Sequence, residues 1–525
     1  MKTINEEAIK ISEIKLNLMN ELNRKRKKER KRYIFMDNLD EFGINKLFIS
    51  RFLTSLWNCP EAMYKILINS DPIEIQTNLA PLIVNNFYIN YLSGNYIENN
   101  LLYILTLMIK DEIEKLEDID KVTNFLDNTR CGYLLEELQK KADIQLFFNK
   151  VIVKIIEDME NKYSSKEFLL NLTKIDEEIN KIKNDIEKGD KKNKTILDPN
   201  QIYKKIRDNK IGNNNLKDAQ EKGKIFAGKY LTNIEVNDLE KNAEEAKNNN
   251  DLSEYYLKFV REIKDKNSKD IYSNENFVNS FQKITSSPET VLIFYQNDFF
   301  EIKEVLENII NSLLNHLLLL PYSVKCLCKI ISVLIRNKFK NITKTEENGF
   351  IAKFFFGKLF IPIIKNPGFN ALISEFVISG NTIKNINIIN IIINKLFSGN
   401  LFKGNTEEMY YTPFNWFFLD KMKEVLSFYE NCTNAKLPSF IEKFINNELP
   451  QDYKYNYFNE NKDEFYANIS ICFNINSLIR LIEGIKKCPE IFNFNNDYVD
   501  KLKKSYERLN VEDTLKEIIE KEQNL

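Results

Sequence analysis

The chain has almost none of the side chains that metal sites and acid–base catalysts commonly use. Histidine occurs once, as His316, and the seven cysteines are scattered, so no Cys/His zinc set is available. His316 lies in an apolar helical stretch with no placed carboxylate, serine or cysteine, which favours a structural role over general-base chemistry. No nucleophile elbow, pair of catalytic carboxylates or glycine-rich dinucleotide loop stands out. We therefore expect no metal, no cofactor and no catalysis on a small molecule.

Glycine and proline are also scarce, at 14 and 12 of 525 residues, and this excludes a fold built on many tight turns. Leucine, isoleucine, lysine, glutamate and asparagine dominate, and no alternating strand pattern separated by turn signals is found. The hydrophobic share of 43% is enough for a large interior. We predict an all-α, elongated multi-helix protein. Apolar residues repeat at helical spacing in two clear stretches. They are Leu102, Leu105, Ile109, Ile113 and Leu116 in the first, and Leu306, Ile310, Leu313, Leu317 and Leu320 in the second.

The chain lacks an excess of either charge. Lysine and arginine number 75 and aspartate and glutamate 76, a formal net charge of -1, which argues against binding nucleic acid through bulk phosphate attraction. Only residues 24–32 break the balance, with a basic run after an amphipathic stretch at 9–22. This run is typical either of a tether to an acidic cytoskeletal or membrane surface or of a solvated helix, and the pattern leaves both open.

A long apolar run is missing as well. The longest, residues 354–364, is interrupted by Lys358 and is too short to span a bilayer, and the N-terminus has no apolar signal core. We expect a cytoplasmic protein, and the sequence leaves association with a membrane or the cytoskeleton open. A P-loop spacing at 223–230 ends in Tyr230 instead of the magnesium-binding Ser or Thr and follows no strand, so we interpret it as a helix break.

The composition changes along the chain and predicts three regions. Residues 1–45 form a basic amphipathic N-terminal helix, residues 46–402 a helical domain, and residues 403–525 a C-terminal helical region. Within the middle region, residues from about 174 to 285 are rich in lysine, aspartate, glutamate and asparagine. Here we expect a charged insertion of long, exposed helices.

Three segments, in this order along the chain, resemble the Ras GTPase-activating (RasGAP) fold. Residues 125–138, FLDNTRCGYLLEEL, are similar to the finger loop and its helix, and residues 320–331, LPYSVKCLCKII, to the Pro-x-x-Leu-Arg helix. Residues 356–364, FGKLFIPII, followed by 367–373, PGFNALI, are similar to the Phe-Leu-Arg-Phe-x-x-Pro-Ala signature. The resemblance covers roughly residues 48–170 and 290–402. It is closest to the divergent RasGAP-like domains of Rab-exchange factors and IQ-motif GAPs.

The resemblance assigns roles to individual residues. In this family an arginine finger neutralises charge on the transferred phosphoryl group, worth about 10³–10⁵ in rate. The finger position corresponds to Asp127, whose carboxylate would repel the phosphates. The signature arginine that braces the loop corresponds to Lys358 and the helix arginine to Lys325, both of which keep the charge but lose the planar fork.

Arg130 is the one residue near the finger position that could restore its chemistry. It lies three residues after Asp127 and would serve as a displaced finger if the loop shifted, or it pairs with a local acid and faces solvent. The resemblance also implies a docking surface for a small GTPase of the Ras or Rab type, formed by Asp127, Asn128, Thr129, Lys325 and Lys358. The leading hypothesis is a GTPase-binding regulator with weak or lost GAP activity. The alternative is a non-catalytic scaffold in a large cytoskeletal or ciliary assembly.

Overall fold

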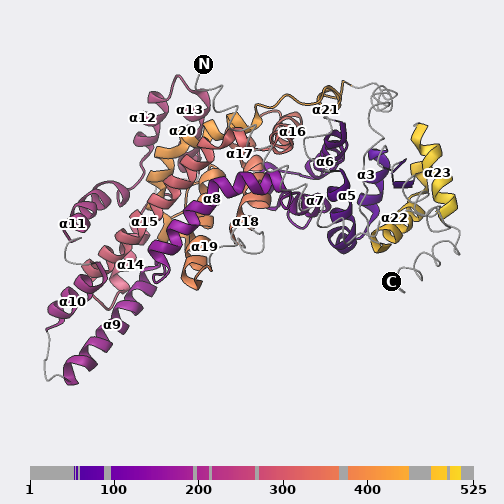
Figure 1. Cartoon of the computed structure of the whole chain (residues 1–525). Helices are drawn as coiled ribbons and strands as arrows, with labels where there is room; N and C mark the ends of the chain where they lie inside the picture. Colours follow the sequence, from indigo (N-terminus) through magenta and orange to yellow (C-terminus); the bar gives the residue numbers. More distant parts are fainter. Residues whose placement is uncertain are drawn as a thin grey trace, which may run out of the picture. The chain divides into compact units, whose positions relative to one another are not determined.

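The described part of the computed structural model consists of helices and the segments that connect them (Figure 1). It describes residues 52–53, 55–56, 59–87, 96–192, 198–211, 216–265, 271–365, 377–448, 475–493 and 497–509. No strand occurs within these ranges, and the predicted all-α class is confirmed. The basic run at 24–32 and the signature segment at 367–373 lie outside the described residues.

The helices of the first half surround the finger loop and then extend through the charged region; short 3-10 and π segments are labelled η. They are α3 (Pro60–Asn69), α4 (Pro72–Glu74), η1 (Ile75–Leu79), α5 (Ala80–Phe87), α6 (Tyr96–Glu114), η2 (Ile119–Asn124), α7 (Arg130–Leu138), α8 (Ala142–Tyr163), α9 (Leu172–Lys192), α10 (Pro199–Ile211), α11 (Leu216–Ile225), η4 (Phe226–Tyr230), α12 (Val236–Glu245), α13 (Asn250–Asp265), α14 (Glu275–Ser280) and η5 (Phe281–Lys283).

The second half supplies the longest helix and the C-terminal elements. They are α15 (Pro288–Asn315), η6 (Leu317–Leu319), α16 (Tyr322–Lys338), α17 (Lys344–Ala352), η7 (Lys353–Phe360), α18 (Ile361–Lys365), α19 (Gly380–Phe397), η8 (Glu407–Tyr411), α20 (Phe414–Thr433), α21 (Ser439–Ile445), α22 (Ile475–Lys487), η10 (Pro489–Asn493) and α23 (Asp497–Leu509). The chain divides into two compact units, residues 60–491 and a smaller unit of residues 1–59 with 492–525. In the smaller unit, the rings of Phe492 and Tyr506 lie 5.5 Å apart.

The helical periodicities found in the sequence mark buried faces. Leu102, Leu105, Ile109 and Ile113 of α6 are each at most 2% exposed, and α6 packs on α3, α5, α7 and α16. On α15, Leu306 and Leu313 are fully buried, and this helix packs on α8, α9 and α20. These two helices bury the apolar stripes that their spacing predicts.

An aromatic cluster joins η7 to two helices that follow it in the chain, α19 and α20. Phe356 stacks on Phe397 of α19 with ring centroids 4.0 Å apart, and Phe428 of α20 lies 5.0 Å from Phe355. All four rings are at most 1% exposed. Offset and edge-to-face aromatic pairs add to the free energy of area burial, so this cluster fixes η7 firmly in the interior.

The charged region is more tightly bound to the rest of the unit than its composition indicates. On α13, Tyr255, Phe259 and Ile263 are at most 4% exposed, and the helix packs on α17 and α20. Lys258 donates to the carbonyl of Gly399 and to Asn400 Oδ1, at 3.2 and 3.0 Å, just beyond the end of α19. The expectation of exposed helices is therefore wrong for this face of α13, because its aromatic residues recur at spacings of three and four.

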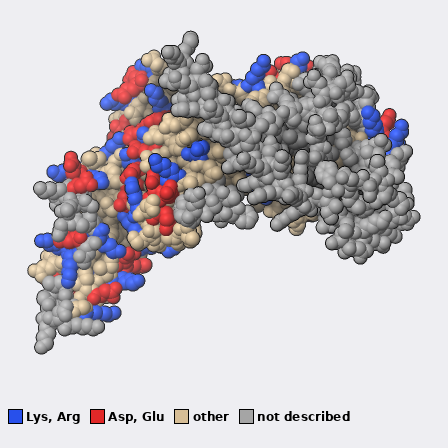
Figure 2. All heavy atoms as spheres, in the orientation of Figure 1, with Lys and Arg blue, Asp and Glu red and all other residues tan. Residues whose placement is uncertain are grey.

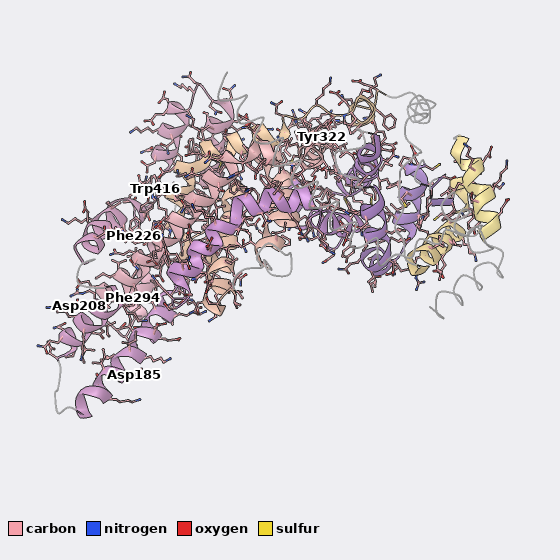
Figure 3. The ribbon with its side chains drawn as sticks, viewed as in Figure 1. Asp185, Asp208, Phe226, Phe294, Tyr322 and Trp416 are labelled. Carbon is pink, nitrogen blue, oxygen red and sulfur yellow. The ribbon has the colours of Figure 1, made fainter. Side chains whose placement is uncertain are left out.

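The outer faces of the charged region agree better with the sequence. Figure 2 shows lysine and arginine atoms interspersed with aspartate and glutamate atoms over this part of the molecule. Figure 3 labels Asp185 on α9 and Asp208 on α10, and it shows Phe226 and Trp416 where η4 meets α20. Trp416 donates its indole N–H to the carbonyl of Thr232, 2.9 Å away. Surface charge and an aromatic inner side thus coexist in the same helices.

Candidate functional site

The finger loop, defined here as residues 125–129, joins η2 to α7. Phe125 and Leu126 are buried, and the Phe125 ring lies 5.4 Å from Phe350 of α17. Asp127 and Asn128, which follow, are exposed. Leu126 and Asn128 both have positive φ, at 66° and 53°. A leucine in this region is rare and strained, so burial on one side and the helix on the other hold the turn that presents Asp127.

The start of α7 locks this turn from behind. Thr129 caps the helix, with its hydroxyl accepting from the Gly132 amide at 3.0 Å and donating to the Leu126 carbonyl at 3.3 Å. A Cβ on Gly132 would lie 2.3 Å from that same Leu126 oxygen. The loop can therefore fold back onto the first turn of α7 only because residue 132 has no side chain.

The Asp127 carboxylate at the loop tip pairs with two lysines. Lys353 Nζ lies 2.5 Å from Oδ2 and Lys358 Nζ 3.3 Å from Oδ1. Lys358 also reaches Glu136 Oε1 of α7 at 3.3 Å, so two ammonium groups face two carboxylates. The Asp127 side chain is 42% exposed, and ion pairs of such exposure contribute only about 0.2–1 kcal/mol each.

Both lysines come from η7, a π-helical segment in which the amide of Ile361 donates to the carbonyl of Phe356, five residues earlier. In an α-helix, residues five apart differ by about 140° in direction. The wider π turn places residues five apart almost above one another, so Lys353 and Lys358 face the same loop. Lys358 is 7% exposed and is a buried brace, whereas the Lys353 side chain is 24% exposed.

Arg130 is turned away from this cluster. Its Nε donates to the carbonyl of Ser70, which follows α3, at 3.1 Å. No acid among the described residues pairs with its guanidinium, and Asp127 pairs with lysines instead. Of the two sequence alternatives, a local ion pair with Asp127 is not seen, and a displaced finger would have to release the Ser70 bond.

Lys325 lies apart from the residues that the structure brings together. It occupies the first turn of α16. Burial raises the pKa of the Cys432 thiol of α20, and the charge of Lys325 acts in the opposite direction. None of the ion pairs within the described ranges links Lys325 to Asp127, which pairs with Lys353 and Lys358 instead. The structure thus unites Asp127 with Lys358, and it adds Lys353 and Glu136, which sequence reasoning missed.

A signal for Lys353 exists in the sequence but is weak. The family signature has leucine before its arginine, whereas this chain has Gly357 before Lys358. A Cβ on Gly357 would lie 3.5 Å from Lys353 Cδ and 4.0 Å from Cε. Both distances are ordinary van der Waals contacts, so only a side chain longer than alanine at residue 357 would crowd the Lys353 stem.

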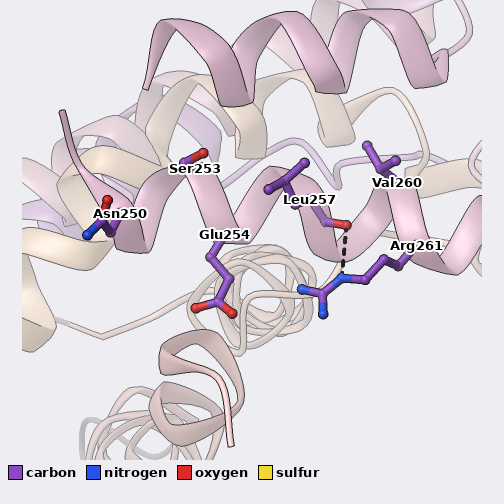
Figure 4. A pocket seen from close by; sticks show the side chains of 6 residues that line it. All are labelled: Asn250, Ser253, Glu254, Leu257, Val260 and Arg261. Carbon is purple, nitrogen blue, oxygen red and sulfur yellow. Dashed lines mark hydrogen bonds between the residues drawn. The ribbon is translucent and has the colours of Figure 1, made fainter. Parts of the chain in front are cut away.

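Other parts of the described chain offer little competing chemistry. A hollow of about 440 Å³ runs along α13 and is lined by residues of that helix (Figure 4). There Arg261 Nε donates to the Leu257 carbonyl at 3.4 Å. Burial raises the pKa of the Cys131 thiol and keeps it protonated. Among the described residues, no group of three or more potential ligands is placed to hold a metal, and no helix is long and apolar enough to cross a membrane.

Comparison with known proteins agrees with the geometry of the finger loop and η7. Residues 104–398, more than half of the chain, match the RasGAP family, described as GTPase-activator protein for Ras-like GTPase. No curated protein matches the chain. The matched region contains the finger loop, α7 and both lysines of η7. A RasGAP domain interacts with small GTPases and serves their regulation, and the chain belongs to the RasGAP family.

Proposed function

We propose that this domain binds a small GTPase of the Ras or Rab type and accelerates its GTP hydrolysis weakly or not at all. The observation that carries the proposal is the carboxylate of Asp127 at the finger position, held between Lys353 and Lys358. An arginine finger neutralises charge that develops on the phosphoryl oxygens. A carboxylate adds negative charge at that point, so binding survives while the main catalytic contribution is lost.

The docking surface consists of the loop tip and its supporting lysines. Asp127 and Asn128 are exposed, Thr129 caps α7 behind them, and Lys358 braces the loop from η7. Lys325 of α16 is a further proposed contact, and none of the ion pairs of the described residues involves its ammonium group. A GTPase surface with mixed charge suits this set better than a strongly acidic one, because Asp127 and Glu136 balance the two lysines of η7.

Single-turnover GTP hydrolysis across a panel of GTP-loaded Ras and Rab proteins tests the proposal, together with binding measured on the same panel. We expect binding to at least one member, with little acceleration of hydrolysis. Arg130→Ala is compared with Arg261→Ala, because both arginines donate Nε to a backbone carbonyl and only Arg130 lies beside the finger loop. Acceleration that Arg130→Ala leaves unchanged removes Arg130 as a displaced finger. If the wild type binds no GTPase of the panel, the proposal is wrong.

The second candidate function is a non-catalytic scaffold of a cytoskeletal or ciliary assembly, docked in the cytoplasm through residues 24–32. Its support is the basic composition of that run together with the substituted finger position. Deleting residues 1–32 should then change localisation in cells and the recovery of associated proteins. Unchanged localisation and association would rule against this alternative.

A further inference from the structure

Among the residues that the structure describes, Lys353 is the cation closest to the tip of the finger loop, and it lies outside the three family-like segments. Its Nζ lies 2.5 Å from Asp127 Oδ2, at the tip where a finger residue meets its target. Its side chain is 24% exposed, whereas the neighbouring Lys358 is only 9% exposed. Of the two lysines, Lys353 is therefore the one that a docked partner can reach.

Two features of η7 direct this side chain to the loop. The π turn brings residue 353 onto the same side as residue 358, which an α-helical turn would not do. Gly357 lies beside the Lys353 stem, where a Cβ would make an ordinary van der Waals contact with Cδ at 3.5 Å. A leucine at position 357, as in the family signature, would extend into the path of the stem. Insertions of π-helix occur frequently at functional sites.

We propose that Lys353 is the cation that this domain can present to the phosphates of a bound GTP, and that Asp127 masks it. The inference rests on the proposed function, because it needs a docked GTPase. Ammonium groups bind phosphate as point charges, so Lys353 suits this task without the arginine fork. In the masked state the Asp127 carboxylate pairs with the Lys353 ammonium group, which is then not available to the phosphates.

The other ion pairs of the cluster allow the Lys353–Asp127 pair to break without leaving Asp127 unpaired. Lys358 pairs with both Asp127 and Glu136, so Asp127 keeps one ammonium partner when Lys353 leaves. In the reaction, water attacks the γ-phosphorus and the bond to the β–γ bridging oxygen breaks. The proton of the water passes to the released phosphate, and Lys353 only donates hydrogen bonds to phosphoryl oxygens. Lys353 therefore stabilises the phosphoryl oxygens by its charge and its hydrogen bonds, without the bidentate fork of arginine, and its effect is smaller than that of an arginine finger.

The first experiment measures single-turnover hydrolysis with a GTPase that the wild type binds. Asp127→Asn keeps the shape of the side chain and removes its charge, and we expect about 10- to 100-fold faster hydrolysis than with the wild type. Adding Lys353→Gln should abolish the gain, and adding Lys353→Arg should preserve or increase it. Lys162→Gln serves as the matched control, since it removes a lysine that pairs with Glu304 at the surface. Lys162 lies in the last turn of α8, about 30 Å along the helix from its first residue, Ala142. A gain that persists in Asp127→Asn/Lys353→Gln overturns the proposal, as does the absence of a gain in Asp127→Asn that still binds.

The second experiment needs no GTPase and uses inorganic tripolyphosphate as the probe. Lysine side-chain amine signals are followed by NMR during titration of the wild type, Asp127→Asn and Asp127→Asn/Gly357→Leu. We expect a saturable shift of the Lys353 signal in Asp127→Asn, and its loss when leucine displaces the stem. Equal responses in the wild type and Asp127→Asn would refute masking. If this titration succeeds while no GTPase binds, the proposed function fails and the masking of Lys353 stands.

Discussion

Gly132 gives the sharpest test of how the finger loop is held. In a helix, replacing glycine by alanine normally raises the free energy of unfolding by about 1 kcal/mol. At Gly132 the new Cβ would lie 2.3 Å from the Leu126 carbonyl oxygen, against a minimum of 3.0 Å for real contacts, so the loop must move by at least about 0.7 Å. Overpacking of this kind costs about 1–3 kcal/mol. The obstacle is backbone that is tied to Thr129, and it cannot rotate away.

We therefore expect Gly132→Ala to lower the free energy of unfolding by about 1–2 kcal/mol, with the sign opposite to helix propensity. Thermal melting measures the global change, and hydrogen exchange of residues 126–132 shows whether the loop opens. Gly189→Ala is the control, because this glycine of α9 has no heavy atom within 4 Å of the added Cβ and should gain stability. If Gly132→Ala is as stable as the wild type while Gly189→Ala behaves as expected, the loop is not locked as described.

Two further predictions concern the interior. Burial raises the pKa of Asp298 from 3.8 to about 6 although Lys166 lies beside it. The contribution of this carboxyl to stability is therefore full below its unfolded pKa and is lost as pH rises through about 6. In urea unfolding, the free energy of unfolding of Asp298→Asn should fall less between about pH 4 and 7 than that of the wild type. Gly399 has φ of +67°, so Gly399→Ala should lower stability by about 1–2 kcal/mol in the same assay. Gly380→Ala, with no neighbour within 4 Å, should be nearly neutral, and an equal loss at both glycines would contradict the strain argument.

The helices could be predicted from the sequence because they depend on local spacing. Leucine and isoleucine at helical intervals marked the buried faces of α6 and α15, whereas the finger position of Asp127 comes from the family resemblance and stays a prediction. The bond from Arg130 to the Ser70 carbonyl spans 60 residues of sequence, so no local pattern could indicate it.

The part of the site that sequence reasoning missed depends on a change of helical register. Lys353 and Lys358 point in different directions under an α-helical assignment, and only the π turn of η7 brings them together. The residues of η7 are mostly apolar, and Gly357 is their one weak sign of this register. Likewise, the burial of one face of α13 depends on contacts with α17 and α20, which lie far away in the sequence. Charge composition alone therefore misjudged its exposure.

The aromatic cluster around η7 sets a lower limit on the length of any autonomous fragment of this protein. The match to the RasGAP family ends at residue 398, but Phe428 of α20 covers Phe355, Phe356 and Phe397 from beyond that limit. A fragment cut at residue 398 would expose three contiguous aromatic rings to water, and exposed patches of this kind promote aggregation. The shortest fragment suited to recombinant work must therefore include α20, which lies beyond the end of the family match at residue 398.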